Sequence, residues 1–558
     1  MDNKQAAILL DEIADMLEIL GENQFKSRAY RKVARELFRL ETDLRQLWRE
    51  GRLQDIPGVG AAIQGKLEEM LQTGDLQYYQ ELSKKVPSGV VEMLRVPGLG
   101  PRTIGHIYRE TGIDTLEKLY KAAQARELRQ LRGLGAKTEY NIKKGVEMLE
   151  SIADKVSLGL ALPLAEELRE HLSAGPGVEK AAVTGSVRRG KPVVGDIDIL
   201  VAAHEEQLVR QSVKRYRWLQ RVTEEKAGYV AGRLQPGIDF EVIIVEPDDF
   251  HLALLLSTGS GAHREKLLPR MEGVDFTAIG SEAGIYEHLS LQYIPPELRE
   301  DRGELELARE GKLPQLVEFK DLQGDLHLHT DWSDGANSIA EMADAARKMG
   351  YTYMAITEHS KSLTVSRGLD EERLLTQIQE IKALNETLTG FKVLSGIEVD
   401  ILADGSLDLS DEVLQQADVV IASIHSYFRL SRSEQTRRII KAIRHPQVDI
   451  IGHLTGRLLL RRPGYEVDVE AVLAEAARCG KALEINAHPD RLDVSEEVAR
   501  RARELGIKMV INSDAHHCAD LSLVKYGVLT ARRGWLQKED VLNTMELDEL
   551  QAYLKRRS

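Results

Sequence analysis

The sequence predicts a protein of several domains, with an all-helical N-terminal region followed by two regions of mixed α and β structure. Its 558 residues exceed the roughly 250 to 300 residues that one hydrophobic core usually serves. Up to about residue 150 apolar residues recur at helical spacing, as in Ile8, Leu9, Ile13 and Met16. Beyond about residue 321, apolar runs of strand length alternate with helical patterns, which is typical of a parallel α/β barrel.

Composition narrows the class of protein. Two cysteines, Cys479 and Cys518, are too few for a disulfide framework. The chain begins with an amphipathic helix pattern rather than a secretion signal, and it contains no apolar stretch of membrane-spanning length. We therefore expect a soluble cytoplasmic protein with no membrane partner.

The net charge of -14 is unevenly distributed. Residues 1–150 carry 24 Lys and Arg against 23 Asp and Glu, so the acidic excess lies downstream. A neutral N-terminal region can still bind DNA through local patches, and an acidic remainder suits domains that hold metal ions.

A glycine motif recurs three times in the helical region, at Ile56–Gly60, Val96–Gly100 and Leu131–Gly135. Each copy lies between two helical segments, which is the helix-hairpin-helix pattern. The glycines permit a tight turn through which DNA phosphates reach backbone N–H groups at the next helix. One copy alone is usually a helix cap, whereas three in register favour DNA binding without base readout. The candidate DNA-binding glycines are Gly58, Gly60, Gly98, Gly100, Gly133 and Gly135.

An acidic strand lies within Thr184–Leu200. Alternation along this strand places Asp196 and Asp198 on one face with their carboxylates side by side. Mg²⁺ or Mn²⁺ would relieve the repulsion, and a phosphate-bearing substrate would complete the coordination. The alternative is a surface hairpin with chance acidic residues. The residues placed to bind phosphate nearby are Gly185, Ser186, Arg188 and Arg189.

Phe25–Lys32 followed by Ile56–Gly60 resembles the small N-terminal domain of DNA polymerase beta and other family X polymerases. The resemblance implies that Lys66 forms a Schiff base with a 5′-deoxyribose phosphate and that Lys26 contacts the 5′-phosphate; an ordinary exposed helix lysine is the alternative for Lys66. Val96–Leu119 resembles the hairpin that holds the primer. In the acidic strand, the resemblance implies triphosphate binding by Gly185, Ser186 and Arg189 and metal binding by Asp196 and Asp198.

The third carboxylate is expected from Gly237–Pro247, a strand with Asp239 and Glu241 on one face. Counting back from Glu246–Phe250 places Glu241, a glutamate, at the family's catalytic aspartate position. The longer side chain moves the carboxylate by more than about 1 Å, and misplacement on that scale can cost about 10²-fold in rate. Further departures from the family pattern stand at Ile243, Ser257, Arg264 and Leu268.

Metal-binding residues follow nearly every strand predicted beyond residue 321. Any single histidine is usually a core or surface residue, but six at strand ends indicate one metal cluster, because the loops at that end of a barrel converge. The candidate ligands are His327, His329, Asp334, His359, Glu398, His425, His453, Asp514 and His516. Glu358 is open to two interpretations, as a residue that supports the ligands or as an exposed charge.

These motifs resemble the PHP (polymerase and histidinol phosphatase) domain. The resemblance implies a distorted (β/α)7 barrel and a three-metal cluster of Mn²⁺ or Zn²⁺ for phosphoester hydrolysis, with Glu398 as the bridging ligand. Mg²⁺ or Mn²⁺ is expected at Asp196, Asp198 and Glu241, in a nucleotidyltransferase-type palm with a mixed sheet.

The chain as a whole resembles bacterial and archaeal family X polymerases with a C-terminal PHP domain. We expect a helical DNA-binding domain at 1–88, two further hairpins at 89–155, the palm at 156–315 and the PHP domain at 316–558, with Ile294–Leu316 as the end of the palm and a linker. The resemblance implies a monomeric repair polymerase acting on gapped or nicked DNA and dNTPs, with 3′-5′ exonuclease or abasic-site endonuclease activity. The alternatives are a nuclease with a palm reduced to a DNA clamp, a DNA-end scaffold and a small-molecule phosphatase.

Overall fold

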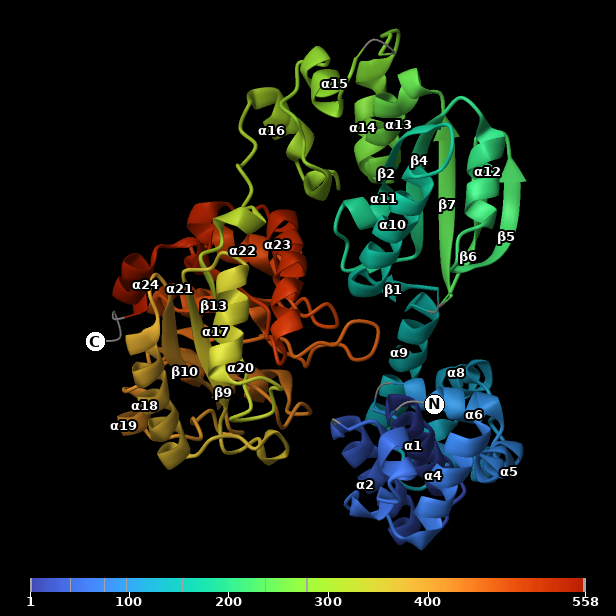
Figure 1. Cartoon of the computed structure of the whole chain (residues 1–558), viewed down its shortest axis with the longest axis vertical. Coiled ribbons are helices and arrows are strands. Elements are labelled where there is room, and N and C mark those ends of the chain that lie inside the picture. The colour runs from blue at the N-terminus through green and yellow to red at the C-terminus, as the bar shows by residue number, and fades with distance from the viewer. Residues whose placement is uncertain are drawn as a thin grey trace. The chain divides into compact units, whose positions relative to one another are not determined.

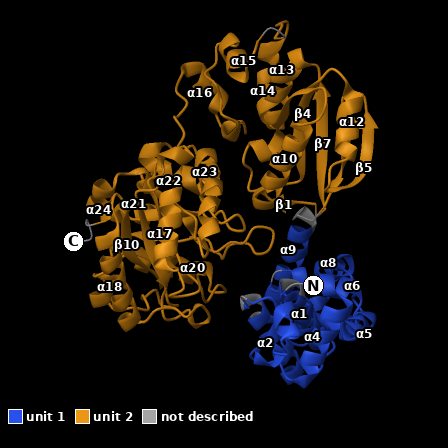
Figure 2. Cartoon of the chain, viewed as in Figure 1, with its two compact units in different colours: residues 1–153 blue, residues 154–558 orange. Residues whose placement is uncertain are grey.

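The computed structural model describes residues 3–40, 42–74, 76–96, 98–152, 154–235, 237–276 and 279–554. The chain forms two compact units, residues 1–153 and 154–558 (Figure 2). Pro97, in the second predicted hairpin, lies outside the described residues. Among the described helices, none has both the length and the apolar character needed to cross a bilayer.

The first unit is built of helices around one hydrophobic core that extends from Ala6 to Leu149. Its central helix, α1 (Asn3–Ile19), packs against α2 (Gln24–Arg39) and α7 (Pro101–Thr111). The remaining helices are α3 (Leu44–Arg49), α4 (Ala61–Thr73), α5 (Gln77–Lys85), α6 (Ser88–Glu92), α8 (Leu116–Gln124) and α9 (Ala136–Ile152). The predicted helical N-terminal region is confirmed.

The second unit begins with a mixed five-stranded sheet in the order β2-β4-β7-β6-β5. Its strands are β2 (Val178–Val183), β4 (Asp196–Ala203), β5 (Leu219–Lys226), β6 (Tyr229–Leu234) and β7 (Ile238–Val245). β4 and β7 are parallel and the other pairs are antiparallel, so the predicted mixed sheet is confirmed.

Helices cover both faces of this sheet, which we call the palm sheet (Figure 1). α10 (Leu158–Ser173) and α12 (Glu206–Lys214) share a core with Ile197, Ile199 and Val201 of β4. α13 (Phe250–Thr258) packs against Leu200 and Ala202, the alternate residues of β4. Asp196 and Asp198 therefore lie on the face that α13 covers.

The segment expected to be a linker is packed. It contains the turn Pro296–Leu298 and helix α16 (Glu304–Glu310), and it shares a core with α14 (Gly261–Met271) and α15 (Glu282–His288). Ile294 and Arg299 are fully buried. The segment is thus part of the folded unit, and the expectation of a linker there is wrong.

A seven-stranded parallel sheet follows, in the order β14-β13-β12-β11-β10-β9-β8. The strands are β8 (Gly324–Leu328), β9 (Tyr353–His359), β10 (Lys392–Asp400), β11 (Val419–Ser423), β12 (Ile450–Ile451), β13 (Ala482–Asn486) and β14 (Met509–Asn512). The edges meet where the His329 N–H donates to the Ala515 carbonyl at 2.9 Å. The predicted seven-stranded barrel is confirmed.

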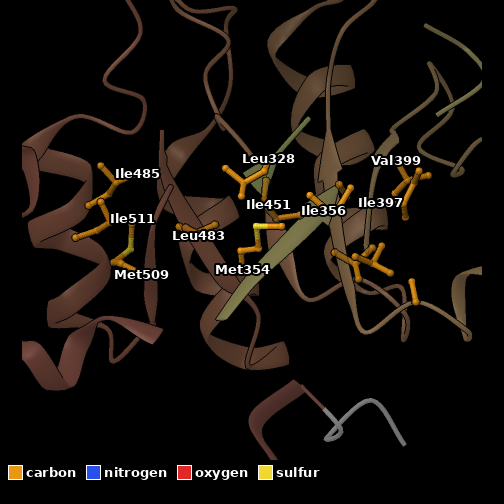
Figure 3. Packing of buried hydrophobic residues seen from close by; sticks show 14 of the residues in the cluster. Leu328, Met354, Ile356, Ile397, Val399, Ile451, Leu483, Ile485, Met509 and Ile511 are labelled. Atoms are coloured by element: carbon orange, nitrogen blue, oxygen red, sulfur yellow. The ribbon is translucent and has the colours of Figure 1, made fainter. Parts of the chain in front are cut away.

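The barrel strands bury apolar residues on both faces. Outward residues such as Met354, Ile356, Ile397 and Val399 pack under surrounding helices (Figure 3). Inward residues form a second core that α24 (Leu547–Leu554) closes at one end. Polar side chains lie at the other end of the barrel, at and beyond the carboxyl ends of the strands. The helices between strands are α17 (Ile339–Lys348), α18 (Glu371–Thr387), α20 (Arg432–Ile443), α21 (Val469–Cys479) and α22 (Glu496–Glu504), with the short α19 (Asp411–Leu414). Helix α23 (Val524–Arg533) follows the last strand, β14.

Candidate active sites

Strand register brings three carboxylates together in the palm. In the parallel pair β4 and β7, Asp196 lies opposite Asp239 and Asp198 lies opposite Glu241. Asp198 and Glu241 line the same pocket as Asp196, whereas Asp239 is exposed and pairs with Arg233 at 2.9 Å. The structure thus groups Glu241, rather than Asp239, with the two aspartates.

Gly185 is needed for Asp198 to occupy its place. Its φ of +60° lies in the left-handed region, and a Cβ built there would stand 1.6 Å from Asp198 Oδ2. The turn that begins with Gly185 therefore packs directly on the metal-ligand candidate.

Electrostatics in the palm favour a bound cation. Burial, followed by the charges of Asp196 and Glu241, raises the pKa of Asp198 to about 7. Burial and the carboxylates of Glu241 and Asp239 also raise the pKa of Asp196. Acidic oxygens that crowd one another in this way form a donor set suited to a hard divalent cation.

The carboxylates open into a pocket of ≈ 520 Å³. Ser186 Oγ and Thr184 Oγ1 border it, and both are buried without a hydrogen-bond partner among the described residues. Buried hydroxyls are normally satisfied, so these two atoms suit a ligand that accepts hydrogen bonds, such as phosphate. The cationic side chains that line the pocket are Arg189, Lys191 and Arg264.

The two consecutive arginines differ in their contacts. Arg188 donates to Thr258 Oγ1 at 2.6 Å and to Glu282 Oε1 at 3.0 Å, away from the pocket lining. Arg189 donates through Nε to Glu300 at 2.9 Å and through Nη1 to the Thr258 carbonyl at 2.8 Å. Arg189 is thus the one that borders the pocket, and Arg188 holds α13 and α15.

The four positions at which the sequence departs from the family pattern differ in their surroundings. Ile243, Ser257 and Arg264 line the pocket, and Arg264 adds a cation beside Arg189. Leu268 is 49% exposed on α14 and lies outside the pocket lining. Sequence reasoning missed Lys191, which stands two residues beyond Arg189 and whose charge was the available signal.

All nine barrel candidates gather at the carboxyl ends of the strands. Alternation brings several of them together, because His359 and Glu398 lie on the inward faces of β9 and β10, and His425 continues the inward alternation just beyond β11. Three sets have ligand atoms within 4.8 Å of one another: His329, Asp334, His359 and His516; His327, His329 and Asp514; His359, Glu398 and His425. The ninth, His453, places Nε2 2.9 Å from Glu398 Oε1.

Glu398 lies at the centre of this group of candidate ligands. Its carboxylate is 2.7 Å from His359 Nδ1, 3.3 Å from His425 Nε2 and 3.5 Å from His327 Nε2. His327 Nε2 and both ring nitrogens of His329 are buried without a hydrogen-bond partner among the described residues. Unpartnered nitrogens facing shared carboxylates fit a cluster of metal ions with mixed N and O ligands.

Charges in the cluster compensate one another. Burial opposes ionisation of Glu398, but the imidazoles of His425, His327 and His359 outweigh it and hold the pKa of Glu398 well below its usual range. Burial lowers the pKa of His329 to about 3, helped by the neighbouring His516 and His359. A neutral imidazole is the form that binds metal.

Three residues that sequence reasoning missed orient the ligands. Glu484 accepts from His327 Nδ1 at 2.6 Å, and Asp400 lies 3.1 Å from His425 Nδ1. Asn486 donates to Asp514 at 2.9 Å. Asp400 stands two residues after Glu398, so strand alternation alone was a signal for it.

Glu358 lies on the opposite face of β9 from the ligand His359. It is fully buried and accepts hydrogen bonds from the Thr330 N–H at 3.0 Å and from Gln377 Nε2 at 3.1 Å, and also from Ser333 Oγ. It therefore supports the loop that carries Asp334 and is not an exposed charge.

The three hairpins of the first unit share one geometry. Gly58, Gly98 and Gly133 have φ of +95°, +80° and +88°, respectively. Each is followed two residues later by the glycine that precedes α4, α7 or α9. A Cβ at those second glycines, Gly60, Gly100 and Gly135, would meet nothing within 4 Å, so packing inside the protein does not require glycine there.

Lys26 and Lys66 converge on one tyrosine. Their Nζ atoms lie 5.1 Å and 4.8 Å from the centre of the Tyr78 ring. Tyr78 in turn stacks on Tyr30 at 6.2 Å. The two lysines that the family resemblance singled out therefore share one surface of the first unit.

Comparisons with known proteins agree with this layout. Residues 1–76 match the model of a helix-hairpin-helix domain, residues 90–147 a SAM-like helix-hairpin-helix tandem, and residues 325–488 the PHP domain. The full chain is similar to the DNA polymerase/3'-5' exonuclease PolX of Bacillus subtilis (strain 168), with 37% identity over 575 residues and 100% of both chains covered. The chain belongs to the PolX family.

Shorter relatives match less of this PolX-family chain. A probable phosphatase of Thermoanaerobacter sp. (strain X514) is 34% identical over 242 residues, covering 41% of this chain and 94% of the relative. A probable phosphatase of Acetivibrio thermocellus is 28% identical over 242 residues, covering 42% of this chain and 95% of the relative. These relatives match less than half of this chain, whereas the PolX relative matches all of it.

Proposed function

We propose that this protein is a DNA polymerase of family X with a PHP-domain 3′-5′ exonuclease, acting in repair on gapped or nicked DNA. The observation that carries the proposal is the presence of two separate acidic centres in one folded unit. One has three carboxylates beside a pocket lined by three cationic side chains, and the other has nine mixed candidate ligands with Glu398 at their centre. Membership of the PolX family supports the pairing of these activities.

In the palm, the protein's own residues would bind and align the nucleotide. Ser186 and Arg189 would donate to triphosphate oxygens, and Lys191 and Arg264 would add positive charge along the pocket. Mg²⁺ or Mn²⁺ held by Asp196, Asp198 and Glu241 would neutralise charge on the transferred phosphoryl group. Gly185 keeps the phosphate turn in contact with Asp198.

In the barrel, the ligands would hold a cluster of Mn²⁺ or Zn²⁺, which supplies a hydroxide nucleophile and stabilises the leaving oxygen when bound. Glu484 and Asp400 fix the ring orientations of His327 and His425 through Nδ1, leaving Nε2 of each ring toward the cluster. Hydrolysis of a 3′-terminal phosphodiester is the reaction that this donor set would support in a DNA-bound enzyme.

In the first unit, the open glycines would admit DNA phosphates to helix N-termini. Lys66 would act as the nucleophile on a 5′-deoxyribose phosphate, with Lys26 binding its phosphate. The pairing of both lysines over Tyr78 supports this lyase activity. Borohydride reduction of a nicked abasic duplex would trap wild type and a Lys85→Ala control, and Lys66→Ala would remove the adduct. Equal trapping of all three would overturn the assignment.

The enzyme would act in the cytoplasm, where bacterial DNA and dNTPs are found, and it would act as a monomer. The alternatives remain distinguishable. A nuclease with a palm reduced to a clamp would shorten primers but never extend them, a scaffold would do neither, and a phosphatase would hydrolyse small phosphomonoesters in preference to DNA.

One assay tests the proposal. A labelled gapped duplex is incubated with Mn²⁺, with and without dNTPs, beside a small phosphomonoester such as p-nitrophenyl phosphate. We expect extension of the primer with dNTPs and 3′ shortening without them. Shortening without extension in either Mg²⁺ or Mn²⁺ would favour the clamp, and unaltered DNA with rapid phosphomonoester hydrolysis would overturn the proposal.

A further inference from the structure

Helix α23 of the barrel packs directly on the palm. Tyr526 of this helix is buried in the core that contains α10 and β4. A Cβ added to Gly190, two residues beyond the short helix α11 (Gly185–Arg188), would stand 3.2 Å from Leu529 Cβ. The barrel therefore touches the palm immediately beside Arg189.

Arg533, the last residue of α23, extends this contact into an ion-pair network. Its side chain is 1% exposed. Nη1 donates to the Arg189 carbonyl at 2.8 Å and to Glu300 Oε1 at 3.0 Å, while Nη2 donates to Glu496 at 2.8 Å. One barrel side chain thus holds both the backbone of Arg189 and the carboxylate of Glu300.

Glu300 links Arg533 to the pocket. The same oxygen, Oε1, accepts from Arg189 Nε at 2.9 Å, and both Glu300 and Arg189 line the pocket beside the palm carboxylates. Arg189 is anchored at Nε and Nη1, which fixes the plane of its guanidinium. Because Glu300 is shared, loss of Arg533 would change both the position and the charge balance of Arg189.

We propose that Arg533 is a positioning residue for nucleotide binding, through which the PHP barrel completes the triphosphate site of the palm. The proposal rests on the proposed polymerase function. Arg533 makes no contact with the nine barrel ligands among its described interactions, so its effect belongs to the palm reaction. A domain that carries the hydrolytic cluster would thereby also set the affinity for dNTPs.

The test uses the full-length protein with Arg533→Gln, Arg533→Lys and Glu300→Gln, measured by steady-state extension of a gapped duplex. We expect Arg533→Gln and Glu300→Gln to raise the KM for dNTP about 10-fold while kcat changes less than about 3-fold. Arg533→Lys keeps the positive charge but loses the planar guanidinium that donates in two directions. Its KM for dNTP should therefore lie between those of wild type and Arg533→Gln. Exonuclease activity without dNTPs reports that the barrel remains folded.

Arg532→Gln is the matched control. Arg532 is the neighbouring residue and pairs with Glu297 at 2.6 Å on the same contact between barrel and palm, but its hydrogen bonds go to Glu297 and the Val317 carbonyl rather than to Glu300 or Arg189. It should leave the KM for dNTP unchanged.

Three results would overturn the inference: an unchanged KM in Arg533→Gln, an equal rise in Arg532→Gln, or a parallel loss of kcat and exonuclease activity. Failure of the proposed function is distinguishable, because wild type itself would then not extend the primer. In that case the Kd for dATP with Mg²⁺, measured for wild type and for Arg533→Gln, would replace the KM as the test. Equal Kd values for the two proteins, or no binding by wild type, would overturn the inference.

Discussion

The palm site and the barrel cluster hold carboxylates together in opposite ways. In the palm, Asp196, Asp198 and Glu241 come from two adjacent strands and face one another. In the barrel, Glu398 and Asp514 lie among imidazoles contributed by several strand ends. The neighbours of an acidic group are acids in the first site and bases in the second.

Because of this difference, the buried carboxylates of the two sites have pKa values shifted in opposite directions. Burial and like charges raise the pKa of Asp198 to about 7, whereas the surrounding histidines overcome burial and hold the pKa of Glu398 well below its usual range. The palm carboxylates therefore depend on an external cation for their compensation, and the barrel carboxylates have internal partners. We expect the palm to be the more sensitive to small changes of geometry.

The largest expected effect comes from Gly185→Ala. The added methyl would collide with Asp198 and would force a left-handed φ on a residue that resists it, so primer extension should fall by about 10³-fold. Exonuclease activity should remain within about 2-fold. Gly195→Ala is the control, because its Cβ meets nothing within 4 Å and its φ is ordinary. The rates of primer extension and primer shortening are measured for both variants on one labelled duplex. Equal extension by Gly185→Ala and Gly195→Ala would contradict the prediction.

A smaller effect is expected from the residues that orient barrel ligands. Asp400→Asn removes the carboxylate beside His425 Nδ1 and should lower exonuclease activity about 10- to 100-fold, with extension unchanged. Asp404→Asn changes a nearby exposed carboxylate that accepts from Ser406 in its own turn and lies 3.7 Å from the exposed Lys441, and it should have no effect on exonuclease activity. If added Mn²⁺ restores the activity of Asp400→Asn, weakened metal binding explains the loss. An exonuclease rate equal to wild type would show that His425 needs no such support.

The smallest expected effect concerns an ion-pair network that stabilises the fold of the palm. Glu282 is buried between Arg188 and Arg299; burial opposes its ionisation, but the two arginines hold its pKa below its usual value. Glu282→Gln should lower the free energy of unfolding by about 3 kcal/mol at pH 7, because it removes the carboxylate that pairs with the buried Arg299 and the half-buried Arg188.

The pH dependence follows from the lowered pKa. The stabilisation by Glu282 is fully present above the unfolded pKa of about 4.3 and is lost as pH falls through the folded value. Denaturant unfolding of wild type and Glu282→Gln should therefore converge below about pH 4. A difference that is constant from pH 7 to pH 3 would rule out this electrostatic origin.

Local sequence patterns predicted the larger features of the fold. Helical spacing predicted the first unit, and the apolar runs beyond residue 321 predicted a parallel α/β barrel, because each pattern reflects burial within its own element. The gathering of His327, Glu398 and Asp514 could also be anticipated, since strand ends in a barrel share one mouth.

Contacts between distant segments were harder to predict. The pairing of Asp198 with Glu241 depends on the register of β4 and β7, which single-strand patterns do not specify. The packing of Ile294–Leu316 was missed, because its apolar residues pack against helices and a barrel tryptophan rather than along one regular face. Arg533 was missed for a similar reason, since its partners Glu300 and Glu496 lie far away in the sequence.

The central claim is that the two centres carry separate reactions. The most direct measurement follows one gapped duplex with Mn²⁺ and dNTPs, comparing Asp198→Ala, His329→Ala and the double variant. We expect Asp198→Ala only to shorten the primer, His329→Ala only to extend it and the double variant to leave it intact, with each lost rate reduced at least about 10³-fold. Extension by Asp198→Ala, or loss of both reactions in either single variant that still binds the duplex, would contradict the claim.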